Sequence, residues 1–364
     1  MTAKPRTSQH ESKARRATDK VSVFAGGVLV GLGLGLADRY WPSSKGSAPA
    51  AGVTRGEKAE SPTQISRRGW RQVLVRTWRE FSDDRIPAVA AGATFYGLLA
   101  LFPAIGAFVS LYGLFAKVDE AQKQVAALRG IFPEGGITVI TDQMTRLAAA
   151  PDGGLGATFV VSLLLSVWSS NAGVKAVMAG LNVAYEEREH RNFIKLNLVS
   201  LSFTGGAIIF ALFTVAAVSA APAMLGRLGL ESLGWLSILR WPALLAVVVA
   251  AMSLLYRYGP SRAHARWRWI TPGGALGAGG WLAMSLAYSI YVANFGHFDR
   301  TYGSLGAVVG FMTWIWLSLI VILLGAELNS ELEQQTASDT TTGPPLPAGE
   351  RGAAVADGRR QAPT

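Results

Sequence analysis

Six long apolar runs, separated by polar segments, dominate the pattern of this chain. The runs lie near residues 87–115, 154–169, 196–221, 236–256, 270–292 and 305–326. The fifth and sixth contain no Lys, Arg, Asp or Glu, and each is long enough to cross a hydrocarbon core of about 30 Å as a helix. Because backbone groups in lipid must satisfy their own hydrogen bonds, such runs predict helices. We therefore expect an all-α fold, a polytopic membrane bundle of six core transmembrane helices.

A seventh apolar stretch, residues 21–37, precedes these six. Gly27, Gly31 and Gly35 recur at every fourth position, so a helix here would present one smooth face suited to close helix packing. We expect an extra, uncleaved, Gly-rich hydrophobic helix. A short anchor without a specific partner is the simpler interpretation, and both spanning and non-spanning placements fit.

Changes in composition divide the chain into five segments. We expect a basic N-terminal tail at 1–20, the Gly-rich hydrophobic segment at 21–41, a disordered Pro/Ser/Gly/Ala-rich linker at 42–66, a six-helix membrane domain at 67–334 and a disordered C-terminal tail at 335–364. The linker and the tail have the low hydrophobicity that is typical of disordered segments.

An amphipathic helix is predicted just before the first span. Apolar side chains recur at helical spacing over residues 70–81, with arginines on most of the remaining surface. Such a helix suits the headgroup layer of a membrane. The candidate contacts with lipid headgroups are Trp70, Arg71, Trp78 and Arg79. A passive anchor is favoured over lipid recognition or a movable gate.

A second amphipathic pattern runs from Val174 to Tyr185, after the polar string SSNAG at 169–173. Transporters use broken helices to expose backbone dipoles to a substrate. An ordinary exit of the second span onto the membrane surface accounts for the same residues and is favoured here.

The distribution of basic residues predicts how the bundle is oriented. The chain has 34 Lys and Arg against 24 Asp and Glu, a formal charge of +10. Apart from the six in the N-terminal tail, twenty-one of these basic residues lie at 38–86, before the first span, or after the second, fourth and sixth, and seven lie in the alternate segments. The positive-inside rule then places both ends of the six-helix core in the cytoplasm. Topology thus explains the basic charge, and nucleic acid is not expected as a partner.

The residues offer little for catalysis. Cysteine is absent and the mean hydropathy is +0.29. The four histidines lie in four different extramembrane segments, and no metal-binding spacing such as HExxH is present. We expect no enzyme activity, no cofactor and no metal site.

Polar and aromatic positions in or beside the spans are the better candidates for a pathway or gate. These are Tyr96, Pro103, Asn294, Tyr302 and Glu327. Glu327 stands out because it ends an uncharged run, and ionisable residues are costly at membrane depth. Structural placement at the interface, pairing with a cytoplasmic arginine and ion coupling are its three alternative roles.

Several ordered motifs resemble one known family. They include ATFYGLLALFPAI (93–105), LNVAYEEREHRNF (181–193), WRWITPGG (267–274), YVANFGHFDRTYGSLGAVV (291–309) and LLGAELNSELE (323–333). Together, over residues 67–334, these are similar to the YihY/BrkB (virulence factor BrkB) family. The resemblance implies a multi-pass bacterial inner-membrane protein with an envelope role. Members were once misnamed ribonuclease BN, and transport of a lipid, an osmolyte or another amphiphile has been proposed for them.

Three functions are therefore weighed. The leading one is a transporter or flippase-like protein, with membrane lipids and a lipid or small-molecule substrate as partners. The second is a non-transporting envelope scaffold, and the least favoured is a ribonuclease. A polar-lined cavity would favour transport, and a dry centre packed with Leu and Ala would favour the scaffold. No pattern in the sequence assigns an oligomeric state.

Overall fold

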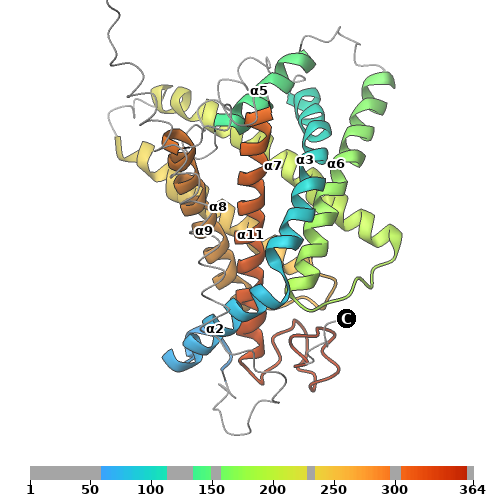
Figure 1. Cartoon of the computed structure of the whole chain (residues 1–364), viewed down its shortest axis with the longest axis vertical. Coiled ribbons are helices and arrows are strands. Elements are labelled where there is room, and N and C mark those ends of the chain that lie inside the picture. The colour runs from blue at the N-terminus through green and yellow to red at the C-terminus, as the bar shows by residue number, and fades with distance from the viewer. Residues whose placement is uncertain (1–58, 113–133, 149–156, 228–233, 296–304, 359–364) are drawn as a thin grey trace, which may run out of the picture. The chain divides into compact units, whose positions relative to one another are not determined.

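The computed structural model describes residues 59–112, 134–148, 157–227, 234–295 and 305–358 (Figure 1). These residues form eight α-helices and one short 3-10 helix, so the all-α prediction is confirmed. The Gly-rich stretch at 21–37 and Tyr302 lie outside the described residues.

The elements follow one another in chain order. They are η1 (Pro62–Gln64), α2 (Arg67–Asp83), α3 (Ile86–Tyr112), α5 (Glu134–Ala148), α6 (Ala157–Ala184), α7 (Phe193–Arg227), α8 (Gly234–Tyr258), α9 (Trp267–Phe295) and α11 (Gly306–Gln334). Four candidate membrane spans are long and apolar enough to cross a bilayer: Ile86–Tyr112, Phe193–Leu212, Trp267–Asn294 and Gly306–Gln334. They coincide with the first, third, fifth and sixth predicted spans. Helices α6 and α8 cover the other two, and the six-span core stays a prediction.

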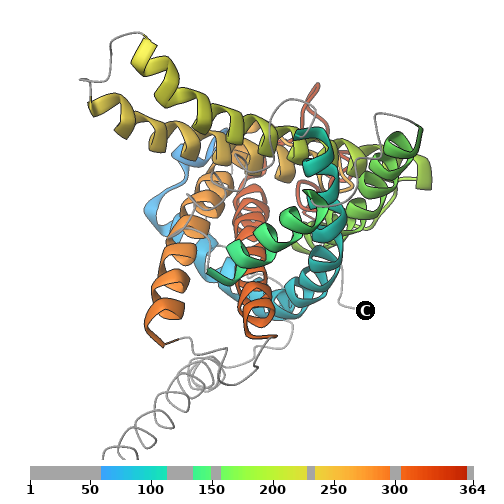
Figure 2. The same ribbon diagram turned by 90° about the horizontal axis from the view of Figure 1, so that it is seen from above.

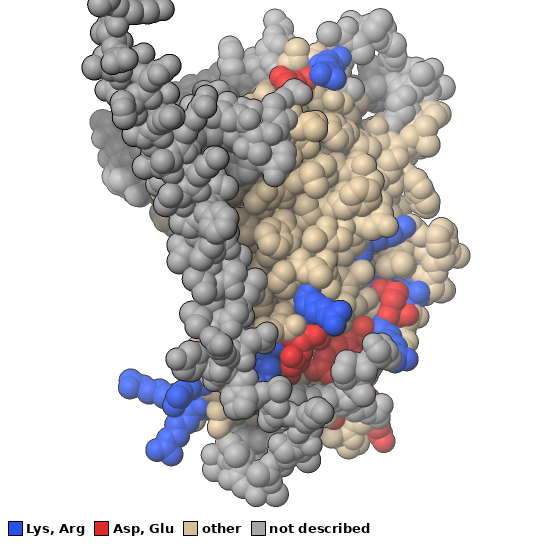
Figure 3. Space-filling view, in the orientation of Figure 1, with Lys and Arg blue, Asp and Glu red and all other residues tan. Residues whose placement is uncertain are grey.

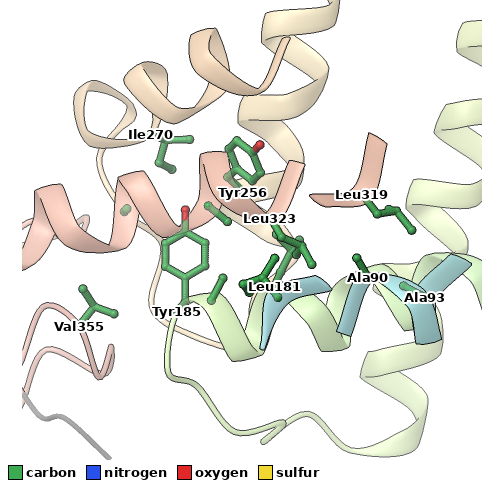
Figure 4. Packing of buried hydrophobic residues seen from close by; sticks show 13 residues of the cluster. Ala90, Ala93, Leu181, Tyr185, Tyr256, Ile270, Leu319, Leu323 and Val355 are labelled. Carbon is green, nitrogen blue, oxygen red and sulfur yellow. The ribbon is translucent and has the colours of Figure 1, made fainter. Parts of the chain in front are cut away.

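Helix α11 is the element around which the other described helices gather. It packs against α9, α3, α2, α5 and α6, and seen from above it lies between α3 and α9 (Figure 2). The main apolar cluster joins α3, α6, α8 and α11 through side chains such as Ala90, Leu181, Tyr256 and Leu323 (Figure 4). Helix α11 therefore links both ends of the described bundle to its apolar centre.

Small residues bring α9 and α11 into close backbone contact. A Cβ atom on Gly273 would lie 2.2 Å from the carbonyl oxygen of Gly325. The Tyr256 hydroxyl lies against Gly277 and Gly325 and donates a hydrogen bond of 2.8 Å to the carbonyl of Ile322. The spacing of Gly273 and Gly277 thus serves the close helix approach that such spacing favours.

Helix α6 is continuous where the sequence suggested an end. Its bounds include both SSNAG at 169–173 and the amphipathic pattern that follows. Asn171 is buried and donates to Asn197 of α7 at 3.3 Å, while Thr204 donates to Asn171 at 3.4 Å. Because these polar groups are satisfied across a helix pair, they need not interrupt the helix, and neither a broken helix nor a separate second interfacial helix is present.

Residues 59–66 of the linker expected at 42–66 and residues 335–358 of the tail expected at 335–364 pack against the helices, and the rest of both segments lies outside the described residues. Ala59 and Ile65 are buried beside Trp269 and Leu328. Val355 joins the main apolar cluster, as Figure 4 shows. The side chain of Arg351 donates to the carbonyls of Leu346, Ala356 and Ala337. The polar composition of the C-terminal segment gave no sign of this packing. Hydrogen bonds hold much of the segment in place, and they leave no periodic apolar pattern in the sequence.

Replacing Gly273 by Ala should destabilise the fold, because its methyl group would collide with the α11 backbone. We expect a loss of about 1–3 kcal/mol in the free energy of unfolding, measured by denaturant titration in mixed micelles. Gly279→Ala is the matched control, since a Cβ there meets no atom within 4 Å. Equal stability of the two variants would contradict the close α9–α11 contact.

Candidate functional site

The last turns of α11 carry three buried acidic residues, here called the acidic end of α11 (Glu327, Glu331 and Glu333). Each is 1% exposed, although the helix that carries them is otherwise apolar. Basic and acidic surface side chains gather at the end of the bundle where α2 lies, below a band without charged side chains (Figure 3). Buried carboxyl groups require hydrogen bonds, a counter-ion or a proton. Each of these three residues meets a different set of partners.

Glu331 fixes α2 across the end of α11. The Arg76 side chain of α2 forms an ion pair with Glu331 and donates 2.6 Å to the side-chain oxygen of Gln335. The same face of α2 buries Val73 and Thr77. Because Arg76 and Glu331 are 255 residues apart in sequence, this ion pair ties the first described helix to the last.

Glu333 fixes the loop between α8 and α9. Arg262 donates to Glu333 at 2.7 Å, and both side chains are almost fully buried, at 2% and 0% exposure. Thr340 donates a second hydrogen bond of 2.7 Å to the same carboxylate. The Arg262 guanidinium lies 4.9 Å from the ring centroid of Tyr185. This pair is structural, with its charges neutralised in place.

Glu327 has a carboxyl group as its partner. A side-chain hydrogen bond joins it to Asp84, which caps the end of α2. The next residue, Arg85, has a left-handed φ of 50° and turns the chain from α2 into α3. Ionised carboxylates only accept hydrogen bonds, so the bond between Asp84 and Glu327 requires a proton on one of them. The Oε1 atom of Glu327 is buried without a hydrogen-bond partner.

The surroundings of this carboxyl pair favour the protonated form. Burial raises the pKa of Asp84, the hydrogen bond with Glu327 lowers it, and the charge of Asp83 raises it again, with a net rise. Glu80 and Glu331 add negative charge near Glu327. Arg76 of α2 is bonded to Glu331. These surroundings favour a proton shared between the two carboxyl groups.

Glu189, in the loop after α6, behaves differently. Burial acts to raise the pKa of Glu189, but hydrogen bonds from Arg191 and Asn182 outweigh it and lower the pKa to about 2. Arg191 also donates to the carbonyl of Gly259 at 2.9 Å, which joins this loop to the end of α8. The ionised Glu189 therefore helps to hold this loop through its ion pair with Arg191.

The other predicted pathway residues do not join Glu327. Tyr96 is 51% exposed and stacks edge-on against Phe95 on α3. Asn294 is exposed and donates to the carbonyl of Ile290 in its own helix. Pro103 is half-buried within α3. Of the predicted positions that the structure describes, Glu327 alone belongs to the buried polar centre.

The predicted headgroup contacts divide between two faces of α2. Arg71, Trp78 and Arg79 are exposed, with Trp78 at 55%. Trp70 instead packs beside Trp269 and Val73 in a cluster with the end of α11. The exposed face keeps the mixture of indole and guanidinium groups that suits a lipid interface.

Sequence reasoning missed Asp84, Arg76 and Arg262, the partners that give the acidic end of α11 its chemistry. They lie in ordinary-looking polar segments, and helical periodicity could not show which helix α2 would cross. The string GAELNSELE was the available signal, because carboxylates four residues apart lie on one face of a helix. Among the described residues, no group of three or more His, Asp or Glu is arranged to hold a metal ion.

Comparisons with known proteins converge on one family. The model of the virulence factor BrkB family matches residues 77–348. The protein named "Putative ribonuclease-like protein YfkH" of Bacillus subtilis (strain 168) is 28% identical over 255 residues, which cover 68% of this chain and 90% of that protein. The "UPF0761 membrane protein NMB0524" of Neisseria meningitidis serogroup B is 30% identical over 275 residues, covering 70% of this chain and 61% of that protein.

A third relative, the "UPF0761 membrane protein Mpe_A1422" of Methylibium petroleiphilum, is 24% identical over 263 residues, covering 71% of this chain and 61% of that protein. The chain therefore spans 61% of the length of each of these two UPF0761 proteins. No solved structure matches the chain.

Replacing Arg262 by Met should leave the buried Glu333 charge uncompensated. We expect a loss of about 3–5 kcal/mol in the free energy of unfolding. The double variant Arg262→Met/Glu333→Leu should recover most of that loss, because no uncompensated charge remains. Arg268→Met, at an exposed position on α9, should change stability by less than about 0.5 kcal/mol. A neutral Arg262→Met would show that the pair is not structural.

Proposed function

The chain belongs to the virulence factor BrkB family, and from this premise we propose that it is a proton-coupled transporter or flippase-like protein of the bacterial inner membrane. It moves an amphiphilic or small polar solute across the bilayer. Helices α6 and α8 complete a six-span core around the four candidate spans. The concentration of basic residues places the end with α2 and the acidic end of α11 in the cytoplasm.

The observation that carries this proposal is the hydrogen-bonded pair of Asp84 and Glu327. One proton sits where an amphipathic helix crosses the end of a membrane span, and Glu327 is 1% exposed. Burying ionisable groups at this depth is costly and marks functional positions in membrane proteins. The neighbouring ion pair of Arg76 and Glu331 already fixes α2, so the carboxyl pair is not needed to attach it.

The direction of the pH effect follows from the raised pKa of Asp84. A carboxyl group whose pKa rises on folding stabilises the folded state fully below its unfolded pKa of about 3.9. That contribution disappears as the pH rises through the raised folded value. Loss of the proton leaves two adjacent negative charges, the half-buried Asp84 and the buried Glu327, which repel the end of α2 from α11.

Movement of α2 would open one end of the bundle towards the lipid interface. The helix joins α3 through the left-handed residue Arg85, and its exposed face carries Trp78 and Arg79. In the protonated state α2 covers the acidic end of α11, and in the deprotonated state the end of α2 at Asp84 separates from α11 while Arg76 stays bonded to Glu331. Alternating these two states couples a proton to the movement of a solute.

The envelope scaffold is the second candidate, and one observation favours it. Apolar side chains from α3, α6, α8 and α11, including Ala93, Leu181 and Leu319, pack together at the centre of the described bundle (Figure 4). A scaffold needs no polar pathway through the bundle, so an apolar centre is sufficient for it. We propose no enzyme activity, although the name of the B. subtilis relative mentions a ribonuclease.

Lipid translocation in proteoliposomes tests proton coupling. The probe is fluorescent NBD-phosphatidylglycerol, reduced from outside by dithionite in vesicles of phosphatidylethanolamine and phosphatidylglycerol. Under a pH gradient the wild type should accelerate translocation, and Glu327→Gln should slow it roughly 5- to 150-fold, the range of typical coupling energies. Glu350→Gln, at an exposed position, is the control. A folded wild type without translocation would favour the scaffold.

The orientation can be tested with single cysteines, because the natural chain contains none. Asp142→Cys on α5 and Arg188→Cys in the loop after α6 both lie at exposed positions. In intact spheroplasts, a membrane-impermeant maleimide should label Asp142→Cys at once and Arg188→Cys only after permeabilisation. Both should react equally in detergent. The reverse order of labelling would contradict the proposed cytoplasmic location of the acidic end of α11.

A further inference from the structure

Arg257, at the end of α8, differs from the other arginines in the described part of the chain that are buried or half-buried. Its Nε and Nη1 atoms are buried and have no hydrogen-bond partner. The others each donate to a carboxylate or a carbonyl oxygen: Arg76, Arg191, Arg262, Arg266 and Arg351. A guanidinium presents five N–H donors and accepts no hydrogen bond, so donors without an acceptor are costly when buried.

Two aromatic rings lie beside this guanidinium, but they leave its Nε and Nη1 donors without an acceptor. The central carbon of the guanidinium lies 4.5 Å from the ring centroid of Trp267 and 5.5 Å from that of Tyr258. The attraction between a cation and a ring acts through the face of the aromatic ring. It supplies no hydrogen-bond acceptor, whereas a phosphate group binds a guanidinium through two parallel hydrogen bonds in the plane of its N–H groups. The two rings therefore hold the group without supplying its acceptors.

The charge around Arg257 is positive. His264 hydrogen-bonds to the backbone of Arg257, and burial lowers the pKa of this histidine, with the charges of Arg257, Arg262 and Lys195 lowering it further. The carboxylates on the neighbouring segments are already engaged, Glu189 by Arg191 and Glu333 by Arg262. A mobile anion is thus the ligand that completes the site.

The position of the site indicates where this anion comes from. Arg257 lies near the end of the apolar stretch Leu245–Tyr258. Trp267 is 47% exposed and begins α9, and tryptophan rings concentrate at the level of lipid headgroups. We propose that Arg257, flanked by Trp267 and Tyr258, binds the phosphate group of a phospholipid headgroup. This site is separate from the carboxyl pair, and its occupation does not depend on proton coupling.

A purely structural role makes a different prediction. If Arg257 only fastens α8 to α9 through its stack on Trp267, its replacement lowers thermal stability and leaves phosphate binding unchanged. The decisive quantity is therefore the ligand concentration that gives the half-maximal rise in the thermal unfolding midpoint, because a ligand that binds only the folded state raises that midpoint.

Two ligands separate the sources of phosphate. The full-length chain in mild detergent is titrated with sodium phosphate, against sodium chloride of equal ionic strength, and with dihexanoylphosphatidylglycerol below its micellar concentration. We expect a saturable rise with the lipid. A rise with inorganic phosphate of equal affinity would assign the site to free phosphate and overturn the lipid source, whereas a much weaker response to inorganic phosphate supports the lipid headgroup.

Variants then assign the binding to Arg257. Arg257→Gln should require roughly tenfold more lipid or more, because it loses charge-assisted hydrogen bonds. Arg257→Lys keeps the charge without the planar donors and should also bind roughly tenfold more weakly. It decides the matter if Arg257→Gln fails to fold. Arg268→Gln, an exposed charge change on the first turn of α9, should bind as the wild type does. No saturable binding to the wild type, or unchanged binding in both Arg257 variants, would overturn the proposal.

Discussion

Burial of three carboxyl groups at the end of an apolar helix is the constraint on which this structure depends. Glu327, Glu331 and Glu333 occupy the turns of α11 that α2, the α8–α9 loop and the C-terminal segment cover. A buried charge without compensation costs several kcal/mol, so each covering element must bring a donor, a cation or a proton. Arg76 and Arg262 bring cations, and Thr340 brings a hydroxyl. Asp84 instead brings a second carboxyl group. The contact between Asp84 and Glu327 therefore needs a proton, and its protonation state is the one that can change.

Helix α11 also connects this acidic end to the apolar part of the bundle, through its close contact with α9. Gly273 and Gly325 let α9 and α11 touch through their backbones, and Asn329 accepts a hydrogen bond of 2.8 Å from the amide of Gly273. Asn329 also donates to the Tyr185 hydroxyl at 3.3 Å. Because the contacting surfaces are backbone rather than flexible side chains, α9 and α11 form the fixed part in the proposed movement of α2.

The sequence was informative where one segment decides its own structure. Uncharged runs predicted the candidate spans, helical spacing predicted α2, and Glu327 was found because it ends an uncharged run. The sequence was silent where the outcome depends on which segments meet. Nothing in SSNAG shows that Asn171 would find Asn197 and allow α6 to continue. Nothing in REFSDDR separates Asp84 from Asp83, yet one is bonded to Glu327 and the other is exposed. Tyr96 and Asn294 looked equally suitable, but their helices turn them away from the polar centre.

The covering segments also differ in how firmly they are held, and this decides which one can open. Backbone hydrogen bonds from Arg266 to Thr340 and from Thr342 to His264 join the C-terminal segment to the α8–α9 loop. Within the segment, the Arg351 side chain donates to the carbonyls of Ala337 and Ala356. These hydrogen bonds involve no carboxyl group, and the carboxylates of Asp339 and Asp357 accept others within the same segment. Helix α2 is held at its centre by Arg76 and at its end by a carboxyl pair whose bond exists only while a proton is shared. Loss of that proton thus releases the end of α2 next to Arg85 first, with Arg76 as the pivot and the C-terminal segment in place. The exposed indole and guanidinium groups of α2 make the lipid interface the surface that such a movement would disturb.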